Sequence, residues 1–193
     1  MNEPEINPTD PLEPPGGILI WILIFLELTT FGLALVFMTN AGHEEAGLFH
    51  SSRLRLNTAL GLLNTLLLLS SGFCMASSLR HYKSDDKLRS SRFLRWAMFL
   101  GWMFILVKGF EFSAKIAEEL TLGSNTFFTY YWLLTGFHFI HVLIGLCILF
   151  LLNRTVYIGK TAQNLEYFDA GAAFWHMCDL IWLMIFPMLY LFY

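Results

Sequence analysis

Three histidines lie inside long apolar stretches of the chain, where they could bind a metal or a haem. His138 and His141 are one helical turn apart in "GFHFIHVLIG", and His176 follows in "FWHMCDLIW". Two side chains so spaced on one helix face lie about 5–6 Å apart at Cβ, so they cannot sandwich one haem. A haem between His176 and either neighbour, or a mononuclear metal held by all three, is the cofactor hypothesis. A two-haem anchor would need four histidines at matched depths, and the other three fall between the apolar stretches.

Carboxylates lie at similar depth and offer these histidines partners. Glu27 is central in "WILIFLELTTF", and Asp179 follows His176 by three residues. Ionisable groups inside a bilayer are costly and pair with one another. A neutral imidazole donates from one nitrogen and accepts at the other, so His176 can bond Asp179 and a histidine from another helix can bond Glu27. We therefore predict an intramembrane polar network of Glu27, His138, His141, His176 and Asp179 that holds no metal. A proton relay through Glu27 is the alternative.

Two further polar patterns fall in other apolar stretches. Lys108, Glu111 and Lys115 follow one another at i, i+3 and i+7 in "VKGFEFSAK", and Glu111–Lys115 has the favoured i, i+4 order. We predict ion pairs at a helix end here, with a ligand site as the alternative.

The sequence "LNTALGLLNTLLLLSSG" repeats Leu-Asn-Thr after seven residues. This spacing aligns Asn57, Gly61 and Asn64 on one helix face, with Ser71 a heptad further on. Small residues and amides at such positions favour close helix packing in lipid.

The elements that position these residues are membrane helices. The residues AVILMFWYC make up 56% of the 193 and charged residues 14%, and the mean hydropathy is +0.56, which is typical of a membrane protein. A spanning helix needs about 20 apolar residues. Five stretches qualify, at about 17–39, 56–79, 93–116, 127–152 and 170–193. We predict an all-α fold, a five-helix transmembrane bundle over 17–193, preceded by an extended acidic, Pro-rich tail over 1–16 that lacks the basic start of a signal peptide.

Basic residues predict the orientation. Eight of them fall in the second and fourth connections, on the side of the N-terminal tail, and three on the opposite side. The side richer in Lys and Arg is normally cytoplasmic, so we predict an inside N-terminus and an outside C-terminus. The net charge of −3 predicts no nucleic-acid partner.

We also expect aromatic belts at the membrane interfaces, formed by Trp21, Trp96, Tyr130, Tyr131 and Tyr190. Pro187 should kink the last helix. We expect no catalytic residue, since no nucleophile–base pair, phosphate loop, CxxC or HExxH occurs.

Several of these motifs resemble one family in the right order. The segment 123–154, "GSNTFFTYYWLLTGFHFIHVLIGLCILFLLNR", resembles the penultimate helix of subunit III of cytochrome c oxidase, and 169–191 resembles the last one, with Asp169 where the family usually has Glu. Glu27 matches the family's intramembrane glutamate and Glu111 its Glu-aromatic element. The resemblance covers about 17–193, and the first two of the family's usual seven helices have no match.

The resemblance implies a subunit that binds no cofactor of its own beyond structural phospholipid. Its partner is the haem-bearing catalytic subunit of a respiratory complex, which it stabilises and serves in proton uptake or gas access. Short five-helix relatives ending in "WHM.DL.W...FP.LYL" resemble the accessory subunits of nitric oxide reductases, and we favour that branch, in a bacterial inner membrane, over a terminal oxidase. The other readings are a haem-binding anchor and a small proton channel or transporter. An odd helix number without an internal repeat disfavours a transporter.

Overall fold

The computed structural model describes residues 14–158 and 162–193. Five of its helices are long and apolar enough to cross a membrane, which confirms the predicted five-helix bundle. They are α1 (Ile18–Glu44), α3 (Thr58–Lys83), α4 (Lys87–Ala117), α5 (Thr126–Ile158) and α6 (Ala162–Tyr190). Most of the predicted tail, residues 1–13, lies outside the described residues.

The helices extend beyond the apolar stretches at several ends. α3 continues to Lys83 and α4 begins at Lys87, so polar residues that we expected in a loop are helical. The cap explains the start of α4, because the Asp86 carboxylate accepts the backbone N–H of Arg89 at 3.1 Å. Between the two helices, Asp85 adopts the left-handed region (φ +62°) that ends α3.

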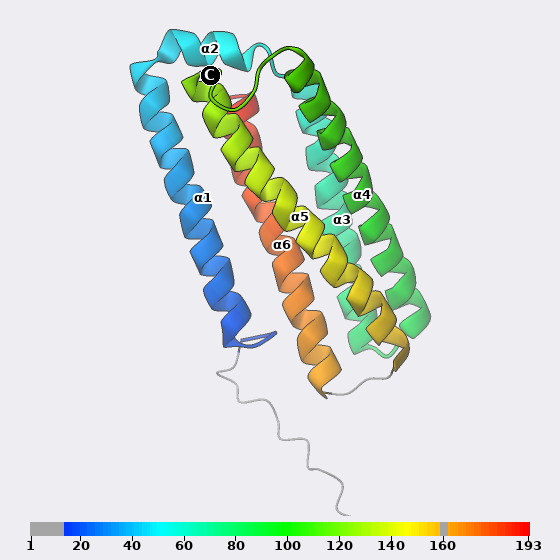
Figure 1. The fold of residues 1–193 in the computed structure, drawn as a ribbon. Coiled ribbons are helices and arrows are strands. Elements are labelled where there is room, and N and C mark those ends of the chain that lie inside the picture. The colour runs from blue at the N-terminus through cyan, green and yellow to red at the C-terminus, as the bar shows by residue number, and fades with distance from the viewer. Residues whose placement is uncertain (1–13, 159–161) are drawn as a thin grey trace, which may run out of the picture.

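A short helix, α2 (Ala46–Arg53), was not predicted and lies across one end of the bundle (Figure 1). Its sequence "AGLFHSSR" is polar, and Phe49 is its one fully buried large side chain, packed against Phe127 and Tyr193. Arg53 Nε donates to the carbonyl of Tyr190 at 3.0 Å, so α2 supplies a donor to the carbonyl end of α6. A single apolar anchor leaves no helical periodicity to detect.

Small residues set how closely the helices approach. α3 and α4 form an antiparallel pair, α5 and α6 pack on it, and α1 leans on α5 and α6 at the far side (Figure 1). A Cβ on Gly101 would lie 2.9 Å from both Trp175 and Leu146, and one on Gly145 would lie 2.7 Å from Trp175. The Trp175 indole therefore fills the space that two glycines leave between α4 and α5.

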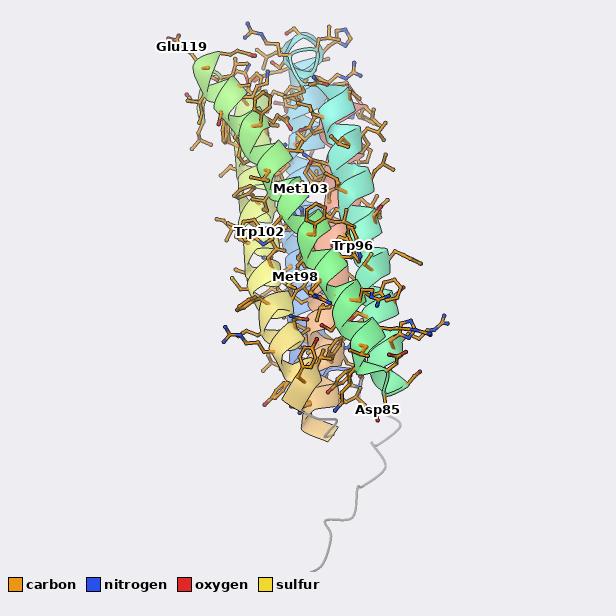
Figure 2. All side chains as sticks on the ribbon, turned by 90° about the vertical axis from the view of Figure 1, so that its right-hand side faces the viewer. Asp85, Trp96, Met98, Trp102, Met103 and Glu119 are labelled. Atoms are coloured by element: carbon orange, nitrogen blue, oxygen red, sulfur yellow. The ribbon has the colours of Figure 1, made fainter. Side chains whose placement is uncertain are left out.

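The side of α4 that faces away from the bundle is apolar. Figure 2 shows the outward side of α4, where Trp96 and Trp102 project away from the bundle; they are 54% and 50% exposed. Side chains of this kind suit contact with lipid or with another membrane protein.

The connections at the two ends place the basic residues as the sequence assigned them. The α3–α4 turn, the start of α1 and the described end of α5 lie at one end; α2 and the C-terminus lie at the other (Figure 1). Lys160, counted with the first end, lies outside the described residues. The inside position of the N-terminus stays a prediction.

Candidate functional site

A fully buried polar cluster joins α4, α5 and α6. The Lys108 ammonium donates to Glu111 Oε2 at 3.2 Å, to the Tyr131 hydroxyl at 3.3 Å and to the Tyr190 hydroxyl at 2.7 Å. Both tyrosine hydroxyls in turn donate to Glu111 Oε1, at 2.9 Å and 2.5 Å. These four side chains, which we call the Lys108 cluster, satisfy one another's hydrogen-bonding groups.

The ring of Trp182 adds to the surroundings of this ammonium. Lys108 Nζ lies 5.3 Å from the Trp182 ring centroid and 5.2 Å from that of Phe112, distances at which a cation is attracted to an aromatic face. Lys108 is 1% exposed, so its charge is held inside the bundle. Ion pairing, hydroxyl acceptors and ring faces together compensate for its desolvation.

The predicted ion pairs are partly rearranged. Glu111 pairs with Lys108 and not with Lys115, whose ammonium instead contacts Glu118 Oε2 at 2.8 Å and the Arg55 carbonyl at 2.7 Å. The i, i+4 pair between Glu111 and Lys115 does not form, because the Glu111 carboxylate faces two tyrosine donors inside the bundle.

The tyrosines of this cluster were assigned wrongly from sequence. Tyr131 and Tyr190 are both 0% exposed, so they do not belong to an interfacial belt. Their positions near the ends of apolar stretches suggested the membrane surface. The cluster lies toward the α2 end of the bundle, where the ends of α5 and α6 are covered by other elements. The sequence signals for this cluster were a tyrosine near the end of a span and a charged residue on another helix. The spacing of residues along the chain does not show whether two such side chains lie at the same depth in the membrane.

Glu27 and His141 meet across α1 and α5. Their Oε2 and Nε2 atoms are 3.4 Å apart, an ion-pair distance that falls short of a hydrogen bond with good geometry. The other ring nitrogen of His141, Nδ1, lies 2.9 Å from the carbonyl of Phe137. A carbonyl only accepts, so the Nδ1 contact requires a hydrogen on Nδ1, and a hydrogen bond between Nε2 and the carboxylate would require a further proton on one of those two atoms. The contact joins α1 to α5.

His138 has different surroundings from its neighbour. It is 0% exposed, stacks on Trp182 at 5.4 Å between centroids and meets the edge of Phe104 at 5.8 Å. Within the described part of the chain, neither of its ring nitrogens has a hydrogen-bond partner. The structure therefore brings His141 and Glu27 together but places His138 in an aromatic box.

His176 and Asp179 form the second pair, on α6. His176 Nδ1 lies 3.2 Å from Asp179 Oδ2, as the i, i+3 spacing allows. The carboxylate sits against the backbone of α3 at Gly72, where any Cβ would collide with Oδ2. Nearer the start of α6, Asp169 forms an ion pair with Lys83 of α3 at 2.8 Å.

The predicted packing face of α3 holds for three residues of four. Gly61 lies under Phe186 and Tyr190, Asn64 is buried, and Ser71 donates to the Ala97 carbonyl at 2.7 Å while accepting from Trp175 Nε1. Asn57 is exposed instead. Its side-chain oxygen accepts the N–H groups of Ala59 and Leu60, so it caps the helix and does not pack against another.

An open pocket of about 650 Å³ lies where the α2–α3 connection meets α4. Its lining combines the apolar Leu54 and Phe110 with the cationic Arg55 and Lys115 and the acidic Glu111 and Glu118. A pocket at a helix end with this mixed lining suits an amphipathic molecule.

The three intramembrane histidines face three different surroundings: the aromatic box, the Glu27 carboxylate and, for His176, the outer surface. Over residues 14–158 and 162–193, no three or more His, Cys, Asp and Glu side chains gather as metal ligands would. The three histidines thus do not converge on one point in the described part of the chain.

Comparisons with known proteins agree on one family. The family model described as "Cytochrome c oxidase subunit III" matches residues 19–193. Cytochrome c oxidase subunit 3 of Allomyces macrogynus is 30% identical over 130 residues, which are 67% of this chain and 46% of that protein. The protein of the same name from Marchantia polymorpha is 31% identical over 66% of this chain and 48% of its own length. The probable cytochrome c oxidase subunit 3 of Mycobacterium leprae is 27% identical over 90% of this chain and 85% of its own length. The chain thus spans about half the length of the first two relatives.

Proposed function

The chain belongs to the cytochrome c oxidase subunit III family, and from this premise we propose that it is a non-catalytic accessory membrane subunit of a haem–copper-type respiratory enzyme. The observation that carries the proposal is the family match over 19–193, which includes all five membrane-spanning helices. The partner is the haem-bearing catalytic subunit, and the electron chemistry takes place there.

The arrangement of charges supports a stabilising role. Lys108 pairs with Glu111 and Asp179 with His176, within 3.2 Å in each case, and Glu27 contacts His141 at 3.4 Å. The first two pairs lie within one helix each, but Lys108 also bonds Tyr131 of α5 and Tyr190 of α6, and Glu27 of α1 contacts His141 of α5. These contacts between helices favour a fixed arrangement that presents a rigid surface to a neighbour. The Glu27–His141 contact places two titratable side chains together within the bundle, which also supports a part in proton uptake.

We assign the complex to the nitric oxide reductase branch, with a terminal oxidase as the second candidate. The ending "WHMCDLIWLMIFPMLYL" resembles the short accessory subunits of that branch, and the mycobacterial relative, of which the chain covers 85%, supports a bacterial plasma membrane. Consumption of NO and of O₂ by the purified complex, each recorded with an electrode, decides between the branches.

Co-purification tests the function itself. A tagged chain extracted in mild detergent is expected to bring down one large haem-bearing membrane subunit in a fixed ratio of haem to tag. The isolated chain is expected to show no haem absorption. A red isolated chain would support the anchor hypothesis instead, and a chain that never associates with a haem protein would refute the accessory role.

Structural phospholipid is the ligand that we propose for this subunit. The pocket beside Arg55 and Lys115 supports it, because cationic groups next to apolar side chains suit a lipid headgroup and its chains. Mass spectrometry of lipids retained by the purified complex, compared with an Arg55→Leu variant, tests the site.

A further inference from the structure

One ionisable side chain near the middle of a membrane span faces outward. His176 lies near the midpoint of the span Asn164–Tyr190, and its side chain is 44% exposed. The next residues on the same strip of α6, Leu180 and Leu183, are 45% and 41% exposed. We call these three residues the outer strip of α6. Hydrocarbon offers no hydrogen bond, so lipid alone would leave the exposed imidazole nitrogen unsatisfied at this depth.

The pairing with Asp179 determines what His176 presents to the outside. Its Nδ1 lies 3.2 Å from a carboxylate oxygen, which accepts, so in the neutral ring Nδ1 carries the hydrogen and Nε2 is an acceptor. The second carboxylate oxygen, Asp179 Oδ1, is buried and has no hydrogen-bond partner among the described residues. The dyad therefore presents Nε2 to the outside, where the neutral ring offers an acceptor and no donor.

We propose that the outer strip of α6 is the surface on which the catalytic subunit docks, through a membrane helix that presents a hydrogen-bond donor to His176 Nε2. A hydroxyl, a carboxamide N–H or an indole N–H meets this requirement. The inference rests on the proposed function and adds the face, the depth and the chemistry of the contact.

A second copy of this chain fits the strip less well. Copies related by a two-fold axis through the strip would bring the same atom into opposition, Nε2 against Nε2. Two acceptors cannot bond each other, so a symmetric pair would leave both nitrogens unsatisfied. A different protein that carries a donor avoids this problem.

The outer side of α4 provides a matched control. Its exposed large side chains between Trp96 and Phe110 are apolar or aromatic, including Leu106 at 59%, and Figure 2 shows the tryptophans of this side projecting outward. Such a surface is satisfied by lipid and does not require a polar partner. Leu106 and Leu180 are thus the same residue type on the two faces, and both point out of the bundle.

Site-specific cross-linking tests the placement. A photoreactive benzoylphenylalanine is introduced at Leu180 or at Leu106, and membranes containing the whole complex are irradiated. We expect the Leu180 variant to cross-link to the haem-bearing subunit and the Leu106 variant to do so much less. A stable complex in which Leu106 cross-links and Leu180 does not, or in which Leu180 captures a second copy or lipid only, overturns the docking surface alone. A chain that never co-purifies with a haem protein overturns the proposed function and this inference together.

Variants at His176 test the donor contact. His176→Leu should weaken retention of the subunit in the complex by about 3- to 20-fold, the value of one interhelical hydrogen bond, while His176→Gln, which keeps an acceptor, should retain most of it. Because the leucine variant also leaves Asp179 without its histidine, the double variant His176→Leu/Asp179→Asn is needed. A double variant that still dissociates supports the contact. Full retention of the single or the double variant would mean that His176 bonds nothing outside its own chain.

Discussion

The Lys108 cluster predicts how strongly one buried charge stabilises the bundle. In Lys108→Met, the Glu111 carboxylate keeps the donated bonds of Tyr131 and Tyr190, at 2.9 Å and 2.5 Å, but loses its only cation within 4 Å in the described chain. Breaking a buried pair by removing one partner costs about 3–5 kcal/mol. The two remaining hydroxyl donors place the expected loss near the lower end, at about 3 kcal/mol of unfolding free energy.

The measurement is reversible unfolding in mixed dodecyl maltoside and dodecyl sulfate micelles, followed by tryptophan fluorescence. Adding Glu111→Gln should recover part of the loss, because a neutral amide needs no cation; coupling between two such contacting groups is about 1–3 kcal/mol. Lys115→Met is the control, since its acid, Glu118, is 48% exposed, and we expect about 1 kcal/mol or less. Equal effects at Lys108 and Lys115, or strict additivity of the double variant, would show that the cluster is not a coupled unit.

Two more predictions concern helix contacts. Gly72→Ala should cost about 1–3 kcal/mol in the same unfolding assay, since a Cβ there collides with Asp179, while Gly109→Ala, with no atom within 4 Å of its Cβ, should be neutral; equal costs would contradict the close α3–α6 approach. Glu27→Gln should cost only about 0.6–1.7 kcal/mol and should speed amide hydrogen exchange in α1 more than in α4, because the carboxylate ties α1 to His141. Uniform faster exchange in all helices would argue against a local tie.

The membrane helices could be predicted from sequence because each must supply about 20 apolar residues. One contact within a helix could be predicted too, since the i, i+3 spacing brings His176 to Asp179. α2 could not, because one buried phenylalanine, Phe49, is enough to dock a polar helix when the chain on both sides is already fixed.

Contacts between helices depended on relative depth, which spacing does not encode. Tyr131 and Tyr190 looked interfacial by position, yet both reach the Lys108 ammonium because neighbouring elements cover the ends of their helices. His138 and His141 looked equivalent, yet one turn of helix separates an aromatic box from a carboxylate. The missing information in both cases is the rotation and shift of each helix in the bundle.

The buried charges suggest why a subunit of this kind can assist a redox enzyme without taking part in its chemistry. Lys108 and Glu111 compensate each other's charge inside the bundle, and Glu27 and Asp179 each have an imidazole within 3.4 Å. Removing one partner of a buried ion pair is costly, so such a pair favours a fixed arrangement of its side chains. Glu111 is paired inside the bundle and Glu27 between α1 and α5, while of the three acid–base pairs the His176 dyad turns an acceptor outward. If the subunit responds to its partner anywhere at mid-membrane depth, the response should therefore begin at α6, and the Lys108 cluster should hold α4, α5 and α6 in register while it does.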